Sequence, residues 1–197
     1  LILTAARSGE VRGATWEEID LAARVWTIPA ERMKASKAHR VPLSDAAIAL
    51  LQEMKALALA AGRTTGKAYV FPSPNSRDPE LGSALSDMTL TAVLRRLKLE
   101  AVPHGFRSTF RDWCAEQTDY PNEVAEMALA HAVGNKVEAA YRRGDLLAKR
   151  QQLMQDWTDY ALCRCAGNMT VGHSSDPLAS TRDETPNQHN NTEGAMQ

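Results

Sequence analysis

Cysteine and long apolar runs are both scarce in this 197-residue chain, and each shortage excludes a class of protein. Its three cysteines are an odd number without C-x-x-C spacing, which predicts neither a disulfide framework nor a zinc ribbon and fits a reducing cytosol. No run of about 18 apolar residues occurs, and the first residues lack the stages of a signal peptide. Neither a membrane span nor secretion is therefore expected.

A surplus of positive charge is missing as well. The chain has 23 basic and 24 acidic residues, so bulk charge gives no argument for a nucleic-acid partner. Residues 1–165 carry a net charge of about +2 and residues 166–197 about −3. The latter stretch is rich in Ser, Thr, Asn and Gly and cannot repay the cost of ordering. We expect one folded domain over residues 1–164, apparently cut from a longer protein, and a disordered polar tail over 165–197.

The rest of the composition is that of an ordinary globular protein, with 44% hydrophobic residues. Residues 24–29 and 39–43 predict an antiparallel hairpin with a basic loop, and residues 67–73 predict a third strand. Helical spacing with suitable caps predicts helices over residues 1–11, 45–61, 87–99, 104–118, 121–131, 135–143 and 146–163. The expected fold class is α+β, mainly α, with a small three-stranded antiparallel sheet.

Four separated fragments carry side chains suited to phosphate chemistry. They are ARSGE, MK, HGFR, and LAH followed ten residues later by a tyrosine in AYRR, and they supply Arg7, Lys34, His104, Arg107, His131 and Tyr141. Guanidinium groups are permanently charged and match two phosphate oxygens, while the H-x-x-R spacing puts His104 and Arg107 on one helix face. A tyrosine, with a pKa of about 10, needs nearby cations to act as a nucleophile.

In this order and spacing, the H-x-x-R, L-x-H and A-Y-R-R motifs resemble those of the tyrosine recombinases, the phage-integrase group, and especially prophage and genomic-island integrases. The resemblance covers about residues 1–164, the catalytic domain. It implies that Arg7 and Arg107 bind phosphate, Lys34 is the hairpin lysine, His104 and His131 are the active-site histidines, and Tyr141 is the nucleophile. Ala5 and Ala130 stand where many members have Gly. Members also carry DNA-binding domains ahead of this one, which are absent from the sequence.

The activity implied is that of a site-specific DNA recombinase or integrase of a mobile element. Such an enzyme cuts one strand through Tyr141, leaves a 3′-phosphotyrosine and a free 5′-hydroxyl, and rejoins the strand to a partner. The expected partner is double-stranded DNA, bound by a homo-tetramer in the bacterial cytoplasm, at the nucleoid, with possible DNA-bending accessory proteins. No cofactor, metal or nucleotide is implied. The alternatives are an inactive DNA-binding or oligomerisation remnant and a strand transferase like the type IB topoisomerases.

Each site assignment also has a purely structural alternative. These are an Arg7–Glu10 ion pair on one helix, a solvated loop or a phosphate patch for Lys34, a helix cap for His104, a core position for His131, and packing for Tyr141. The four tryptophans are expected to lie in the core or in subunit contacts, and Cys114 is expected to be buried. His39, close to Lys34, is expected to contact the DNA backbone.

The apolar face of residues 146–163 needs a partner, because large apolar patches are rarely left in water. By the resemblance, this face docks on a neighbouring protomer of a DNA-bound tetramer or folds back on its own domain.

Overall fold

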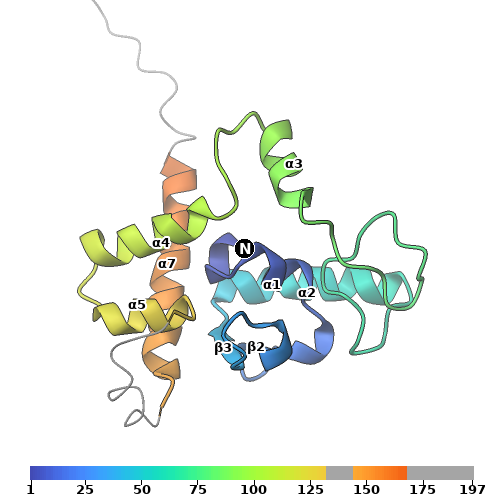
Figure 1. The fold of residues 1–197 in the computed structure, drawn as a ribbon, viewed down its shortest axis with the longest axis horizontal. Helices are drawn as coiled ribbons and strands as arrows, with labels where there is room; N and C mark the ends of the chain where they lie inside the picture. The colour runs from blue at the N-terminus through green and yellow to red at the C-terminus, as the bar shows by residue number, and fades with distance from the viewer. Residues whose placement is uncertain (132–143, 168–197) are drawn as a thin grey trace, which may run out of the picture.

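The computed structural model describes residues 1–131 and 144–167 and is mostly helical, with one small sheet, as the sequence predicts (Figure 1). No helix in these two ranges is long and apolar enough to cross a membrane. The elements are η1 (Ile2–Thr4), α1 (Ser8–Arg12), η2 (Trp16–Glu18), β1 (Ile19–Asp20), β2 (Val25–Ile28), η3 (Ala30–Arg32), β3 (His39–Pro42), α2 (Asp45–Ala60), α3 (Thr89–Arg96), α4 (Gly105–Gln117), α5 (Asn122–Ala128) and α7 (Leu147–Gly167).

The sheet has the order β1-β2-β3 and is antiparallel throughout. The predicted hairpin is confirmed as β2 and β3, but the third strand is β1 and not residues 67–73. Within that stretch Tyr69 forms only an isolated bridge with Thr15, and the N–H of Val70 donates to the carbonyl of Ala14. Val70 is 1% exposed, so its apolar character reflects packing beneath the sheet and not membership of it.

The first predicted helix is broken into two short pieces. The chain turns at Ala5, whose φ of 46° lies in the left-handed region, so η1 ends there and α1 starts afresh after Arg7. Glu10 caps the new helix, because its Oε2 accepts the backbone N–H of Arg7 at 2.7 Å. The break leaves Arg7 at the N-cap, where its side chain is free to leave the helix surface.

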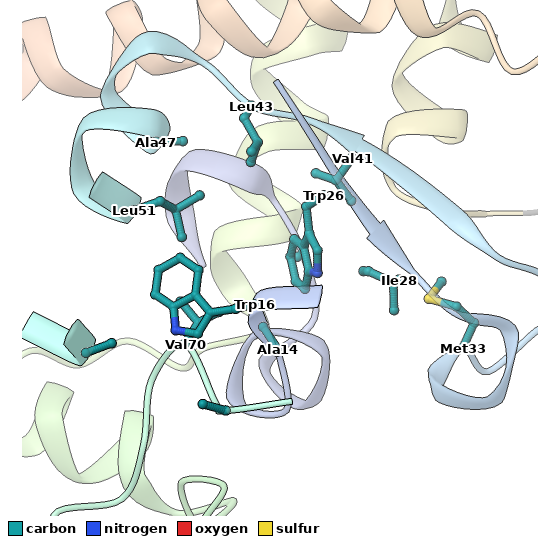
Figure 2. Packing of buried hydrophobic residues seen from close by; sticks show 13 residues of the cluster. Ala14, Trp16, Trp26, Ile28, Met33, Val41, Leu43, Ala47, Leu51 and Val70 are labelled. Carbon is teal, nitrogen blue, oxygen red and sulfur yellow. The ribbon is translucent and has the colours of Figure 1, made fainter. Parts of the chain in front are cut away.

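Two hydrophobic clusters form the core. The first includes Trp26 and Ile28 of the sheet together with Trp16 of η2 and Leu51 of α2 (Figure 2). The second joins α4, α5 and α7, with Trp157 edge-on to Phe110 at a centroid distance of 5.4 Å. All four tryptophans are less than 10% exposed, as is Cys114, which confirms the expectation that they belong to the core.

The apolar face of α7 is buried inside the domain. Leu153, Met154 and Trp157 are at most 3% exposed, and the indole of Trp157 donates to the carbonyl of Ile2 at 2.9 Å. Of the two arrangements expected for this helix, the structure has the intramolecular one, with α7 beside α4 and α5 (Figure 1).

Strand β3 joins the two clusters. The His39 ring bonds to the carbonyl of Ala128 at 3.3 Å, and Arg150 donates from Nη1 to the carbonyl of Arg40 at 2.7 Å. The sheet and the helical half are thereby held together by polar contacts between residues about 100 positions apart in the chain. The candidate site lies where these halves meet.

Candidate active site

Four of the six predicted site residues line one surface groove of about 330 Å³, namely Arg7, Lys34, His104 and Arg107. They come from the N-cap of α1, the loop between β2 and β3, and the start of α4. His131, just after α5, contacts Arg107 from the other side. Tyr141 lies outside the described residues. The structure thus brings together five predicted side chains from four separate segments.

Arg7 serves the groove and an ion pair at the same time. Its Nη1 lies 2.8 Å from Oε1 of Glu10, whose side chain is 6% exposed, whereas the Arg7 side chain is 29% exposed. The helix ion pair given as the structural alternative is therefore present. It does not compete with the functional assignment, because Glu10 holds the guanidinium at the groove wall.

Arg107 is buried, and backbone carbonyls fix its guanidinium. Nη1 donates to the carbonyl of Ala5, and Nη2 donates to the carbonyl of Leu129 at 2.7 Å and lies 3.3 Å from Nε2 of His131. Burial and the nearby charge of Arg7 lower the pKa of Arg107 to about 10, against the opposing effect of Glu10. Arg107 remains a cation at neutral pH and adds its charge to that of Arg7 in the same groove, an arrangement that favours an anion there.

The two carbonyls that hold Arg107 belong to strained turns. Ala5 has a φ of 46° and Ala130, next to Leu129, a φ of 50°. This conformation costs a residue with a side chain roughly 1–2 kcal/mol, which glycine avoids. Glycine, which the resemblance noted above implies for both positions, would avoid this cost, and both turns present a carbonyl to Arg107.

Replacing Ala130, which is half-buried, by glycine should therefore stabilise the fold. We expect the free energy of unfolding to rise by about 0.5–1 kcal/mol, measured by urea denaturation, since relief of strain exceeds the entropy that glycine adds to the unfolded chain. The matched control is Ala56→Gly, at an exposed position of α2, for which the free energy of unfolding should fall by about 1 kcal/mol. A loss of similar size in both variants would contradict this account of the turn.

His131 is held by a carboxylate that sequence reasoning missed. Its Nδ1 lies 2.7 Å from Oε2 of Glu126, whose other oxygen accepts from Nε of Arg111. Burial alone would raise the pKa of Glu126, but hydrogen bonds from His131 and Arg111 outweigh it and lower that pKa. The His131 side chain is 43% exposed, so the core alternative is wrong. The signal available in the sequence was the position of Glu126, five residues before His131 and across the end of the predicted helix.

His104 and Lys34 are both exposed at the rim of the groove. His104 is the N-cap residue of α4, but its side chain makes no capping hydrogen bond, so the capping alternative is not seen. Lys34 directly follows buried Met33. Within residues 1–131 and 144–167, no group of three His, Cys, Asp or Glu side chains is placed to hold a metal ion.

His39 does not point to solvent as the sequence suggested. Its ring is partly buried against the carbonyl of Ala128. Burial, with the positive charges of Arg150 and Arg7, lowers the pKa of His39 to about 4, although the Ala128 bond and Glu10 oppose the change. The ring thus makes an internal contact, and its contact with a DNA backbone stays a prediction.

Acidification should therefore weaken the fold through His39. Between about pH 6.5 and pH 4 the unfolded chain binds a proton on His39 that the folded chain does not, so stability falls as pH falls. We expect His39 to account for about 2 kcal/mol of the loss between pH 7 and pH 5. In the His39→Gln variant, which keeps a donor for Ala128, urea denaturation should show a flatter pH dependence; an unchanged slope would contradict the assignment.

A tyrosine other than Tyr141 can also be considered as a nucleophile. The hydroxyl of Tyr120 donates to Oδ2 of Asp156, and burial together with that carboxylate raises the pKa of Tyr120. Both effects oppose formation of a phenolate. Tyr120 is therefore a structural residue, packed against the second hydrophobic cluster.

Comparison with known proteins identifies the scaffold. Residues 1–146 match the model of the phage integrase family. The chain belongs to this family. It is 38% identical over 176 residues to the prophage integrase IntA of Escherichia coli K12, covering 88% of this chain and 40% of that one. It is 32% identical to the integrase of Enterobacteria phage P4, covering 81% of this chain and 38% of that one.

The fold is also found in a solved structure. The crystal structure of XerA recombinase matches with a TM-score of 0.54 at 18% identity, covering 87% of this chain and 57% of that chain. At this identity the match shows a common fold. The present chain spans about 40% of the length of the two integrases named above.

Proposed function

We propose that this chain is the catalytic part of a site-specific DNA recombinase of a mobile element, which breaks and rejoins DNA strands through a 3′-phosphotyrosine. The observation that carries the proposal is the convergence of Arg7 and Arg107, from segments 100 residues apart, on one groove. Phosphodiesters gain negative charge on their non-bridging oxygens in the transition state. Fixed guanidinium groups stabilise that charge without rearranging, typically by about 3–4 kcal/mol per donor group.

The roles of the two histidines follow from their positions. His131 keeps Nδ1 on the Glu126 carboxylate, which orients the ring. In the neutral ring Nε2 accepts from Arg107, so donation to a phosphate oxygen requires the imidazolium. His104, at the opposite rim, is assigned to the base that takes the proton of the attacking phenol or to a phosphate donor. Tyr141 is the proposed nucleophile.

Lys34 is the proposed acid for the leaving 5′-oxygen. Lys34→Ala should slow cleavage of ordinary DNA about 10²–10⁴-fold, because a deoxyribose alkoxide leaves poorly without a proton. Cleavage of a 5′-bridging phosphorothiolate should be restored, because sulfur leaves without protonation. Gel assays of both substrates provide the measurement, with Lys37→Ala, an exposed lysine of the same loop, as control. Equal loss on both substrates would assign Lys34 to phosphate binding instead.

A suicide DNA substrate tests the function as a whole. A nicked duplex containing the attachment site, incubated with the full 197-residue chain in EDTA, should give a covalent protein–DNA adduct on a denaturing gel. A DNA label that stays on a tyrosine-containing peptide after phosphatase treatment would identify the phosphotyrosine bond between protein and DNA. Binding of the duplex without any adduct would favour the alternative of an inactive remnant.

A further inference from the structure

One further arginine of the groove, Arg32, lies at the base of the loop that carries Lys34. We infer that Arg32 is a positioning residue, which clamps the base of the Lys34 loop to α1 and η2 and so sets the reach of the proposed acid. The inference rests on the function proposed for Lys34. Arg32 is two residues before Lys34, at the end of η3, and lines the same groove.

The clamp consists of three contacts to two different elements. Nη1 of Arg32 donates to both carboxylate oxygens of Glu18 in η2, and Nη2 donates to the backbone carbonyl of Glu10 in α1. Glu18 is itself fixed, because its Oε2 also accepts the indole N–H of Trp26 at 2.9 Å. Glu18 is 9% exposed and Trp26 4% exposed, so the anchor lies in the core.

The loop beyond the clamp has little else to hold it. Residues 34–38 are exposed, and in the described part of the chain their side chains make no hydrogen bond or ion pair. Met33 is 6% exposed and fixes the last buried position before Lys34. The orientation of Lys34 therefore depends on how Arg32 and Met33 hold the base of the loop.

The clamp also joins Lys34 to Arg7. The carbonyl that Arg32 binds belongs to Glu10, and the side chain of Glu10 forms the ion pair with Arg7. One residue thus carries contacts to the phosphate-binding arginine and to the base of the acid loop. Because a misplacement of about 1 Å can cost on the order of 100-fold in rate, this link has a functional consequence.

Gly13 lies close enough to the clamp to perturb it without changing Arg32. A methyl group at Gly13 would sit 2.9 Å from Nη2 of Arg32, too close for two such atoms. The φ of Gly13 is −97°, which alanine adopts without strain. Gly13→Ala should therefore displace the guanidinium while leaving the backbone intact, providing a second, independent variant.

The test compares cleavage of ordinary and 5′-phosphorothiolate nicked DNA by the full chain. Arg32→Ala should slow cleavage of ordinary DNA about 10–100-fold, and its cleavage rate should be largely restored on the phosphorothiolate. The cleavage rates of Arg32→Lys and Gly13→Ala on ordinary DNA should lie between those of Arg32→Ala and the parent chain. Arg7→Ala should lose activity on both substrates. The control is Arg24→Ala, which removes an exposed ion pair with Asp45 at the far end of the hairpin and should change neither rate.

A second measurement separates this inference from the role of Lys34. Hydrogen exchange of residues 33–38 should rise in Arg32→Ala and Gly13→Ala while the exchange of α4 and α5 stays unchanged. Unchanged exchange in the loop, or equal loss of cleavage by Arg32→Ala on both substrates when Lys34→Ala is restored on the phosphorothiolate, would overturn the clamp. A further outcome is that cleavage by Lys34→Ala is not restored on the phosphorothiolate while hydrogen exchange of residues 33–38 still rises in Arg32→Ala. In that case the assignment of Lys34 as the acid fails and the positioning of the loop by Arg32 stands.

Discussion

The Tyr141→Phe variant is expected to form no covalent adduct with a nicked DNA substrate, while it binds the duplex as tightly as the parent chain. The substitution removes one oxygen atom, and in the proposed mechanism that oxygen is the only one able to form the bond to the 3′-phosphate. The groove cations Arg7 and Arg107 are untouched, so affinity for DNA persists. Denaturing gels measure the adduct, and native gels measure binding.

The controls for this prediction are the two described tyrosines nearest in sequence. Tyr120→Phe removes a hydrogen bond to Asp156, and Tyr160→Phe alters a ring stacked near Trp157 at a centroid distance of 5.9 Å. Both should lower stability slightly and still form the adduct. Loss of the adduct in either of them, with its retention in Tyr141→Phe, would show that the A-Y-R-R motif is not the nucleophile.

Introducing charge on the buried face of α7 is expected to unfold the domain. Leu153 is 0% exposed and Trp157 3% exposed, so Leu153→Glu with Trp157→Glu places two unpaired carboxylates in the core. Each buried, unpaired carboxylate costs several kcal/mol. Together the two costs consume most or all of the free energy of unfolding of a typical domain, about 5–15 kcal/mol. Circular dichroism should show loss of the cooperative thermal transition.

Leu162→Glu is the matched control, because Leu162 lies in the same helix but is 48% exposed. It should change the free energy of unfolding by no more than about 0.5 kcal/mol. A double variant that stays folded but fails to assemble on DNA would mean that this face serves contacts between protomers, contrary to the packing described above.

The site was predictable from the sequence to the extent that its chemistry is local. His104 and Arg107 share one helix turn, and the order of the other motifs identifies Arg7, Lys34 and His131. Their supporting partners were not predictable, because those contacts cross the chain: Arg32 meets Glu18 14 residues away, and Arg107 meets the carbonyl of Ala5 102 residues away. Backbone carbonyls leave no signature in residue types.

The errors in the fold have physical causes of the same kind. Residues 1–11 have the apolar spacing of one helix, but the left-handed turn at Ala5 is set by tertiary contacts and not by local preference. Residues 67–73 have the composition of a strand, yet their hydrogen bonds go to loops. By contrast, α2 follows its local signals closely, since the Ser44 hydroxyl accepts from the N–H of Ala47 at 3.4 Å.

The placement of Ala5 has a consequence for the order in which the molecule matures. Ala5 packs in the cluster formed by α4, α5 and α7, and Ile2 accepts a hydrogen bond from Trp157. A ribosome makes these early residues more than 100 positions before their partners. The buried setting of Ala5, whose carbonyl holds Arg107, is therefore complete only after α7 has been made. Contacts of such long range slow folding, so the groove proposed here to act on DNA is completed late in the synthesis of the chain.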